Sequence, residues 1–262
     1  MVSFTHIFVG IGNSGIRVIK NMNMDIPNAI GVTLDSSYYL LGRRRPSFVK
    51  QIRDFFGNLN DDTIIWVIFE DKPINIKIVN LINDSLPRKV IRLAYVLSPY
   101  RELVYEGKPE WASNFETVFY DSLSEFLNDY TSVPLEDAFN KASEQIGIMF
   151  SKLYHYLENQ MLVNVDYADL FNMVKGGNVG ILRILREVDF EWNWGMWDRG
   201  LINIMVGKNV PLKSAHEILK RFQHLLKEKD IIWGIRTNEE LENEIEILAL
   251  LIKRWSNGGN PV

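Results

Sequence analysis

The N-terminal half of the chain alternates short apolar runs with segments of helical periodicity. Segments that read as strands lie at residues 5–9, 29–34, 64–69 and 90–97, and apolar residues at helical spacing lie between them. The third run is apolar at every position, as in strands that are covered on both faces. This βαβαβαβ order predicts an α/β fold with a parallel, doubly wound sheet.

A long helix and a segment of different character follow. The apolar pattern predicts a helix from about residue 134 to residue 160, longer than the ~11 residues of an average helix, and such a helix can be a spine between two subdomains. Beyond it, the pattern predicts strands at 201–206, 231–235 and 245–252 and a helix at 212–227. We therefore expect three parts: a Rossmann-like domain (1–133), the central helix (134–160), and a smaller α+β C-terminal domain (161–262) with some antiparallel pairing.

Composition limits the classes of function. The chain has 262 residues, no cysteine and a formal net charge of -4. The lack of cysteine excludes disulfides, thiolate metal sites and a cysteine nucleophile. The negative charge gives no general attraction to nucleic acid, and no apolar run reaches the ~18 residues that span a bilayer. Because the N-terminus also lacks a signal-peptide pattern, we expect a cytoplasmic protein without a nucleic-acid partner, membrane insertion or a metal site.

A glycine motif lies at the first predicted strand–helix junction. Gly10, Gly12 and Gly15 form a Gly-x-Gly-x-x-Gly pattern, which permits a tight turn and lets backbone N–H groups approach a phosphate at the helix N-terminus. Asp35 ends the next strand at the ~20-residue distance where dinucleotide folds place a ribose-binding acid. The motif predicts a nucleotide site, with an NAD-binding oxidoreductase as one alternative and a tight turn without a ligand as another.

The third predicted strand ends in a segment that is unsuited to a triphosphate. Residues 70–73 read Glu-Asp-Lys-Pro, with two carboxylates, no glycine and a proline that lacks an N–H donor. The carboxylates would repel a polyphosphate, and one lysine does not replace a nest of backbone amides. Triphosphate binding is therefore expected to be weak, and no cofactor is assigned firmly.

An acidic hexapeptide, Asn-Val-Asp-Tyr-Ala-Asp, follows the long helix at residues 164–169. Asn164 can cap a helix that starts here, and Asp166 and Asp169 then lie on one face of its first turn. The helix dipole favours carboxylates at that end. Taken by themselves, these residues indicate a capped, acidic helix start.

Together these segments resemble the tubulin/FtsZ superfamily, in order along nearly the full chain. Residues 9–22 are similar to the first nucleotide loop and helix of that family. Residues 135–139 resemble the start of its central helix, and residues 164–169 resemble its catalytic loop, with Tyr167 in place of Phe. Residues 199–204, 230–234 and 243–245 resemble strands of its second domain.

The resemblance implies a role for each matching residue. The glycine loop, including Asn13, would contact the phosphates of GTP or GDP, Asp137 would contact guanine, and Phe139 would line the base pocket. In the family the GTPase site forms between two subunits, and the catalytic loop of one subunit polarises the attacking water at the nucleotide of the next. The catalytic residues would be Asn164, Asp166 and Asp169, and the expected partners are copies of this chain or other FtsZ/tubulin-like subunits.

Several departures from the family pattern predict a reduced relative. Residues 70–73 stand where the family has a glycine-rich phosphate cradle, and Arg17 stands where it has an asparagine that reads guanine. The helix after the catalytic loop is also curtailed. We therefore expect a regulatory or non-catalytic cytoskeletal or cell-division component with a degenerate GTP site. The alternatives are an active GTPase with altered contacts, an NAD-binding oxidoreductase, and an unrelated binding role on the same fold.

Overall fold

The structure is a computed structural model, and it describes residues 4–22, 28–37, 46–98, 107–122, 130–158, 167–185, 194–227 and 229–255. The chain divides into two compact units. Unit 1 comprises residues 1–151 and 255–262, and unit 2 comprises residues 152–254. The division falls within the long helix α6 (Leu135–Glu158), which contributes residues to both units.

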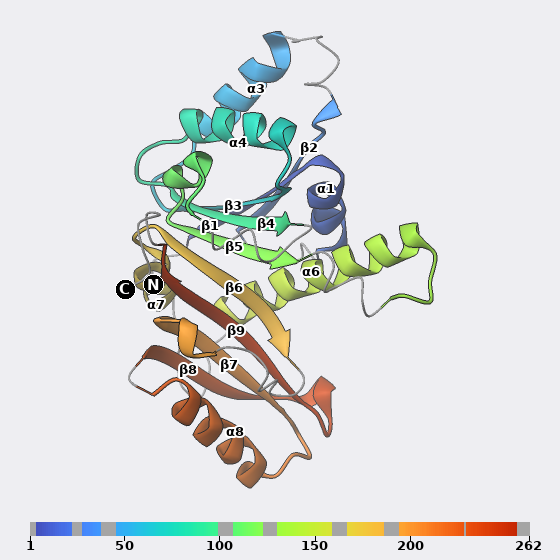
Figure 1. Ribbon diagram of the computed structural model, residues 1–262, viewed down its shortest axis with the longest axis vertical. Helices are drawn as coiled ribbons and strands as arrows, with labels where there is room; N and C mark the ends of the chain where they lie inside the picture. The colour runs from blue at the N-terminus through green and yellow to red at the C-terminus, as the bar shows by residue number, and fades with distance from the viewer. Residues whose placement is uncertain are drawn as a thin grey trace. The chain divides into compact units, whose positions relative to one another are not determined.

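Unit 1 is built on a parallel sheet with the strand order β2-β1-β3-β4-β5 (Figure 1). Seven of the eight residues of β3 are buried, which confirms the expectation from its continuous apolar sequence. The predicted α/β fold is confirmed, although the sequence pattern had not indicated β5. The strands are β1 (Thr5–Ile11), β2 (Ala29–Leu34), β3 (Thr63–Glu70), β4 (Ile91–Ser98) and β5 (Thr117–Ser122).

Helices cover this sheet on both sides, and α4 and α6 lie on opposite sides in Figure 1. Phe150 of α6 is fully buried, and its ring meets those of Phe8, Trp66 and Tyr95 edge-on, with centroids 5.8, 5.3 and 5.2 Å away. This aromatic cluster joins α6 to three neighbouring strands. The other helices of unit 1 are α1 (Gly12–Asn21), α3 (Pro46–Gly57), α4 (Pro73–Ser85) and the 3₁₀ helix η2 (Glu110–Asn114).

Unit 2 contains a mixed sheet with the order β6-β9-β7-β8. Strand β9 is antiparallel to β6 and β7, whereas β7 and β8 are parallel. The expected antiparallel pairing is therefore present, and β6 is a strand that the sequence pattern had not indicated. The elements are α7 (Tyr167–Val174), β6 (Asn178–Leu185), η3 (Trp194–Met196), β7 (Arg199–Gly207), α8 (Leu212–Leu225), β8 (Asp230–Asn238), η4 (Glu239–Leu241) and β9 (Ile245–Arg254).

The core of unit 2 lies between α8 and the sheet. Phe222 and Ala215 of α8 are buried in one cluster with Ile202 and Ile204 of β7 and Ile247 of β9. The apolar positions of α8 recur at helical spacing, so one face is buried and the other carries the charged side chains. None of the described helices of the chain is long and apolar enough to cross a membrane.

Candidate functional site

The glycine motif forms a closely packed junction between β1, β3 and α1. Gly12 has φ 69°, in the left-handed region that favours glycine, and a Cβ there would lie 2.9 Å from Oδ1 of the buried Asn75. A Cβ on Gly10 would lie 2.2 Å from the carbonyl oxygen of Gly15, and one on Gly15 would lie 2.3 Å from that of Ile68. The three glycines are therefore explained by close packing, whatever else they do.

The turn after β3 places a carboxylate against the first turn of α1. The side chain of Glu70 accepts a hydrogen bond from the hydroxyl of Ser14 and forms an ion pair with Lys72. The backbone carbonyl of Glu70 accepts a hydrogen bond of 3.0 Å from Nδ2 of Asn75, which holds the turn to α4. Because β1 and β3 are neighbouring parallel strands, the ends of both strands meet at this edge of the sheet. Negative charge thus lies where the dipole of α1 favours an anion.

A second carboxylate in the same turn adds to the negative potential. Partial desolvation raises the pKa of Asp71 above its usual range. Burial raises the pKa of Tyr120 on β5, and the negative charge of Asp71 raises it further. The turn between β3 and α4 is therefore an acidic region that extends toward the end of β5.

The first turn of α6 is tied to α1. Arg17 of α1 forms an ion pair with Glu136, so this arginine is engaged within the protein. The next residue, Asp137, is exposed, and Phe139 is half-buried one turn into the helix. The structure thus places both residues predicted to contact the base on a helix start that is joined to the helix of the glycine motif.

The remaining predicted nucleotide contacts have different surroundings. Asn13 is exposed at the start of α1. Oδ1 of Asp35 accepts a hydrogen bond of 2.8 Å from the backbone N–H of Ser37, which forms a local turn after β2. Asp35 therefore has a structural partner of its own.

The predicted catalytic loop is described only in part. Asn164 and Asp166 lie outside the described residues. Asp169 lies in the first turn of α7, is half-buried, and belongs to unit 2. This helix has eight residues, which agrees with the short helix expected from the sequence. The structure describes α7 from Tyr167 onward, so the capping role of Asn164 and the catalytic role of Asp169 stay predictions.

Sequence reasoning missed the partners that complete these turns. No sequence motif marks Ser14 or Asn75 as a partner of Glu70. Ser14 lies 56 residues away along the chain, and Asn75 donates to the backbone carbonyl of Glu70 across the turn. The buried carboxylate of Asp121 accepts a hydrogen bond of 2.5 Å from the hydroxyl of Tyr95 and one of 2.9 Å from the N–H of Ser122.

Among the described residues, no group of three or more His, Cys, Asp or Glu side chains could hold a metal ion.

Comparisons of sequence connect the chain with archaeal FtsZ proteins. No protein-family profile matches the chain. "Cell division protein FtsZ 2" of Pyrococcus furiosus is 23% identical over 153 residues, which cover 52% of this chain and 38% of the relative. "Cell division protein FtsZ" of Methanothermobacter thermautotrophicus is 27% identical over 162 residues, which cover 55% of this chain and 42% of the relative. The matched region thus spans about two fifths of the length of each of these curated relatives.

Comparisons of structure extend over the whole fold. The structure "FtsZ dimer, empty (M. jannaschii)" matches with a TM-score of 0.73 at 16% identity, and the match covers 96% of this chain and 89% of the FtsZ chain. The GTPγS-bound protofilament of CetZ2 from Haloferax volcanii matches with a TM-score of 0.68 at 10% identity, and the match covers 97% of this chain and 95% of the CetZ2 chain. The chain therefore has the fold of the tubulin/FtsZ superfamily.

Proposed function

We propose that this chain is an FtsZ/tubulin-like cytoskeletal component of a cell-division system whose own GTP site is degenerate. The FtsZ relatives and the superfamily fold support the cytoskeletal part of the proposal. The degenerate site rests on one observation, the hydrogen bond between Ser14 in the first turn of α1 and the carboxylate of Glu70. The same first turn would have to accept the phosphates of a nucleotide.

The carboxylate of Glu70 works against a phosphate in two ways. It already accepts a hydrogen bond from the hydroxyl of Ser14, and it repels a second anion at the same helix end. Two unit charges about 4 Å apart near a protein surface interact by about 4 kcal/mol, which corresponds to roughly a thousandfold in affinity. Lys72 offsets part of this charge through its ion pair, but Pro73 offers no N–H donor.

The proposed role of the protein is therefore exerted on another subunit. Asp166 and Asp169 would complete the site of a neighbouring FtsZ/tubulin-like subunit by polarising its attacking water. The similar structures include an FtsZ dimer and a CetZ2 protofilament, which supports an assembly partner of this kind. Copies of this chain are the other possible partner. Such a subunit would act in the cytoplasm, where it would alter the turnover or length of a polymer.

Calorimetry with GTP, GDP and Mg²⁺ tests the degenerate site. The purified chain should bind GTP with a dissociation constant no tighter than roughly 1 mM. The double variant Glu70→Gln with Asp71→Asn should bind at least about tenfold more tightly, because it removes both charges and keeps the side-chain shapes. The matched control Asp54→Asn, on the exposed face of α3, should leave the affinity unchanged.

The same calorimetry, repeated with NAD, distinguishes the alternatives. Micromolar binding of GTP by the unaltered chain would contradict the degenerate site and support an active GTPase. Tight binding of NAD would instead support the oxidoreductase. Either result would end the present proposal.

A second assay tests the action on a partner. Adding the chain to an FtsZ-type GTPase from the same cell should change phosphate release or polymer length, measured by phosphate assay and sedimentation. The double variant Asp166→Ala with Asp169→Ala should lose an effect on phosphate release and keep simple end-capping. If no FtsZ-type protein responds, and if Asp169→Asn changes stability by only about 1 kcal/mol or less, the hexapeptide is a helix cap and nothing more.

A further inference from the structure

Strand β8 forms an edge of the sheet in unit 2. It pairs with β7 along all nine of its residues, and no strand in the described part of the chain pairs with its other side. The strand contains no proline. Proteins usually protect long, regular edges, because the unpaired N–H and C=O groups of an edge recruit another strand.

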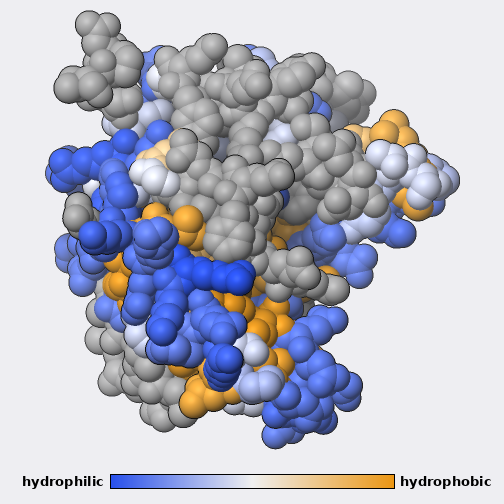
Figure 2. All heavy atoms as spheres, turned by 60° about the horizontal axis from the view of Figure 1, so that its bottom comes forward, coloured by the Kyte–Doolittle hydropathy of each residue, from blue (hydrophilic) through white to orange (hydrophobic). Residues whose placement is uncertain are grey.

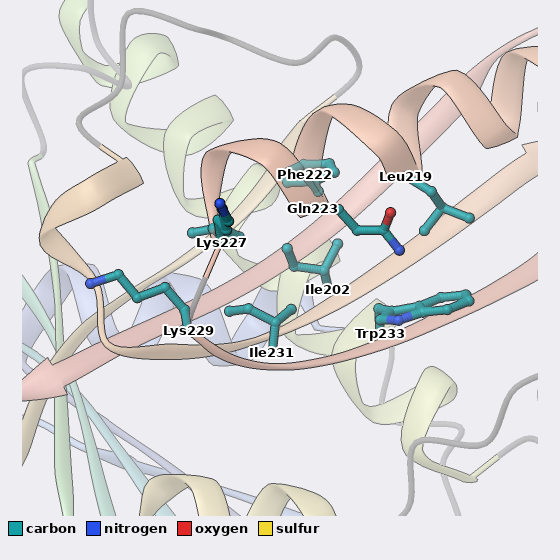
Figure 3. Close-up of a pocket in the computed structure, with 9 residues that line it drawn as sticks. Ile202, Leu219, Phe222, Gln223, Lys227, Lys229, Ile231 and Trp233 are labelled. Atoms are coloured by element: carbon teal, nitrogen blue, oxygen red, sulfur yellow. The ribbon is translucent and has the colours of Figure 1, made fainter.

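A groove runs between this edge strand and α8. Two cavities of about 290 and 400 Å³ share Leu219 of α8 and Trp233 of β8, so they are the two lobes of one groove. Figure 3 shows the first lobe, where Leu219 and Gln223 face Ile231 and Trp233, with Ile202 of the neighbouring strand between them. We refer to both lobes together as the α8–β8 groove.

The apolar side chains of the groove follow the period of a strand. Ile231, Trp233 and Ile235 alternate along β8 and therefore point to the same face of the sheet. Trp233 lines both lobes, and all three side chains are half-buried. Leu212, at the far end of the second lobe, is 82% exposed. An added strand would place alternate side chains into successive lobes, because its residues i and i+2 lie about 7 Å apart on one face.

The charged side chains that line the groove are lysines. Lys227 and Lys229 line the first lobe, whereas Lys213, which lines the second, forms an ion pair of 4.0 Å with Glu217 on the same helix. Among the described residues that line the two lobes there is no Asp or Glu. Because the whole chain has a net charge of -4, this basic lining is a local property. Figure 2, which brings the lower part of Figure 1 forward, shows hydrophobic surface lying between hydrophilic groups.

We propose that the α8–β8 groove binds an extended acidic peptide segment of another protein, which adds to β8 as a further strand. Its backbone would form hydrogen bonds along the edge of β8, and two alternate apolar side chains would fill the two lobes that Trp233 lines. Acidic side chains flanking them would meet Lys227 and Lys229. A helix would fill the groove but would leave the edge of β8 unpaired. The proposal does not depend on the state of the nucleotide site, which lies in unit 1.

A labelled synthetic peptide tests this proposal on the full chain. The probe is fluorescein-Asp-Asp-Ile-Thr-Ile-Thr-Ile-Asp-Asp, titrated by fluorescence anisotropy. It should bind saturably, and Lys227→Glu should weaken binding about fivefold, because an attraction becomes a repulsion. The matched control Lys220→Glu makes the same charge change on α8 outside the groove lining, and it should alter affinity less than about twofold.

Two further measurements identify the occupant as a strand. Amide hydrogen exchange of β8 should slow when the peptide binds, and a peptide with N-methylated backbone amides along one edge should bind at least about tenfold more weakly. The proposal is overturned if binding does not saturate below about 1 mM, or if the N-methylated peptide or a peptide with Lys in place of Asp binds equally well. It is also overturned if an acidic helical peptide binds more tightly, or if a second copy of the chain occupies the groove.

Discussion

His6 gives this protein a calculable dependence of stability on pH. The side chain lies on β1, is 1% exposed, and stacks on Phe8 with ring centroids 6.1 Å apart. Burial lowers the pKa of His6 from its usual 6.5 to about 3. The folded protein therefore holds this imidazole in its neutral form throughout the weakly acidic range.

The sign and size of the effect follow from linkage. Below pH 6.5 the unfolded chain takes up a proton at His6, whereas the folded chain does so only near pH 3. The contribution to stability is therefore complete above pH 6.5 and is lost progressively as the pH falls toward 3. Between pH 8 and pH 5 the free energy of unfolding should fall by about 2 kcal/mol on account of this residue.

Urea unfolding at pH 8 and pH 5, followed by circular dichroism, measures this loss. The variant His6→Gln has no titrating ring, so its free energy of unfolding should fall by about 2 kcal/mol less than that of the unaltered protein over the same range. The control Ile19→Val removes one methylene from the core of unit 1 and keeps the histidine, so it should retain the full pH dependence. Equal pH dependence of His6→Gln and the unaltered protein would refute burial of a neutral histidine as the cause.

Three further variants test the packing that positions the candidate sites, each by urea or thermal unfolding. Gly15→Ala should destabilise unit 1 by roughly 1–3 kcal/mol, since its Cβ would lie 2.3 Å from the carbonyl oxygen of Ile68, and a neutral effect would contradict the close junction. Phe150→Ala should cost roughly 3–5 kcal/mol by removing the ring that meets three other aromatic rings, and a loss below about 1 kcal/mol would argue against that cluster. Lys152→Met should cost roughly 3 kcal/mol of stability, because it removes the cation of the ion pair with the buried carboxylate of Glu246. Adding Glu246→Gln should recover part of this loss, and no recovery would mean that the ion pair is not its cause.

The sequence by itself determined most of the elements and their type. Residues 29–34 form β2 as predicted, and the predicted strand at 64–69 lies within β3, because short segments rich in β-branched and aromatic residues favour strands over helices. It did not determine β5 or β6. The segment of β5 ends in Asp121 and Ser122, which are polar and yet buried. The buried carboxylate of Asp121 accepts a hydrogen bond from the hydroxyl of Tyr95, 26 residues earlier, and no local pattern contains that information.

The sequence also determined which residue types stand at the candidate nucleotide site, but only the tertiary structure decided what they do there. The two carboxylates in the turn after β3 predicted, from their charge alone, that this turn would repel a phosphate. Parallel pairing of β1 and β3 brings Glu70 to Ser14 across 56 residues, and this places the carboxylate against the start of α1. The α8–β8 groove likewise depends on the order of strands in the sheet. Among the described strands β8 lies at the edge, because β9 and not β8 takes the place between β6 and β7. Hydrophobic periodicity does not specify which strand becomes a neighbour of which.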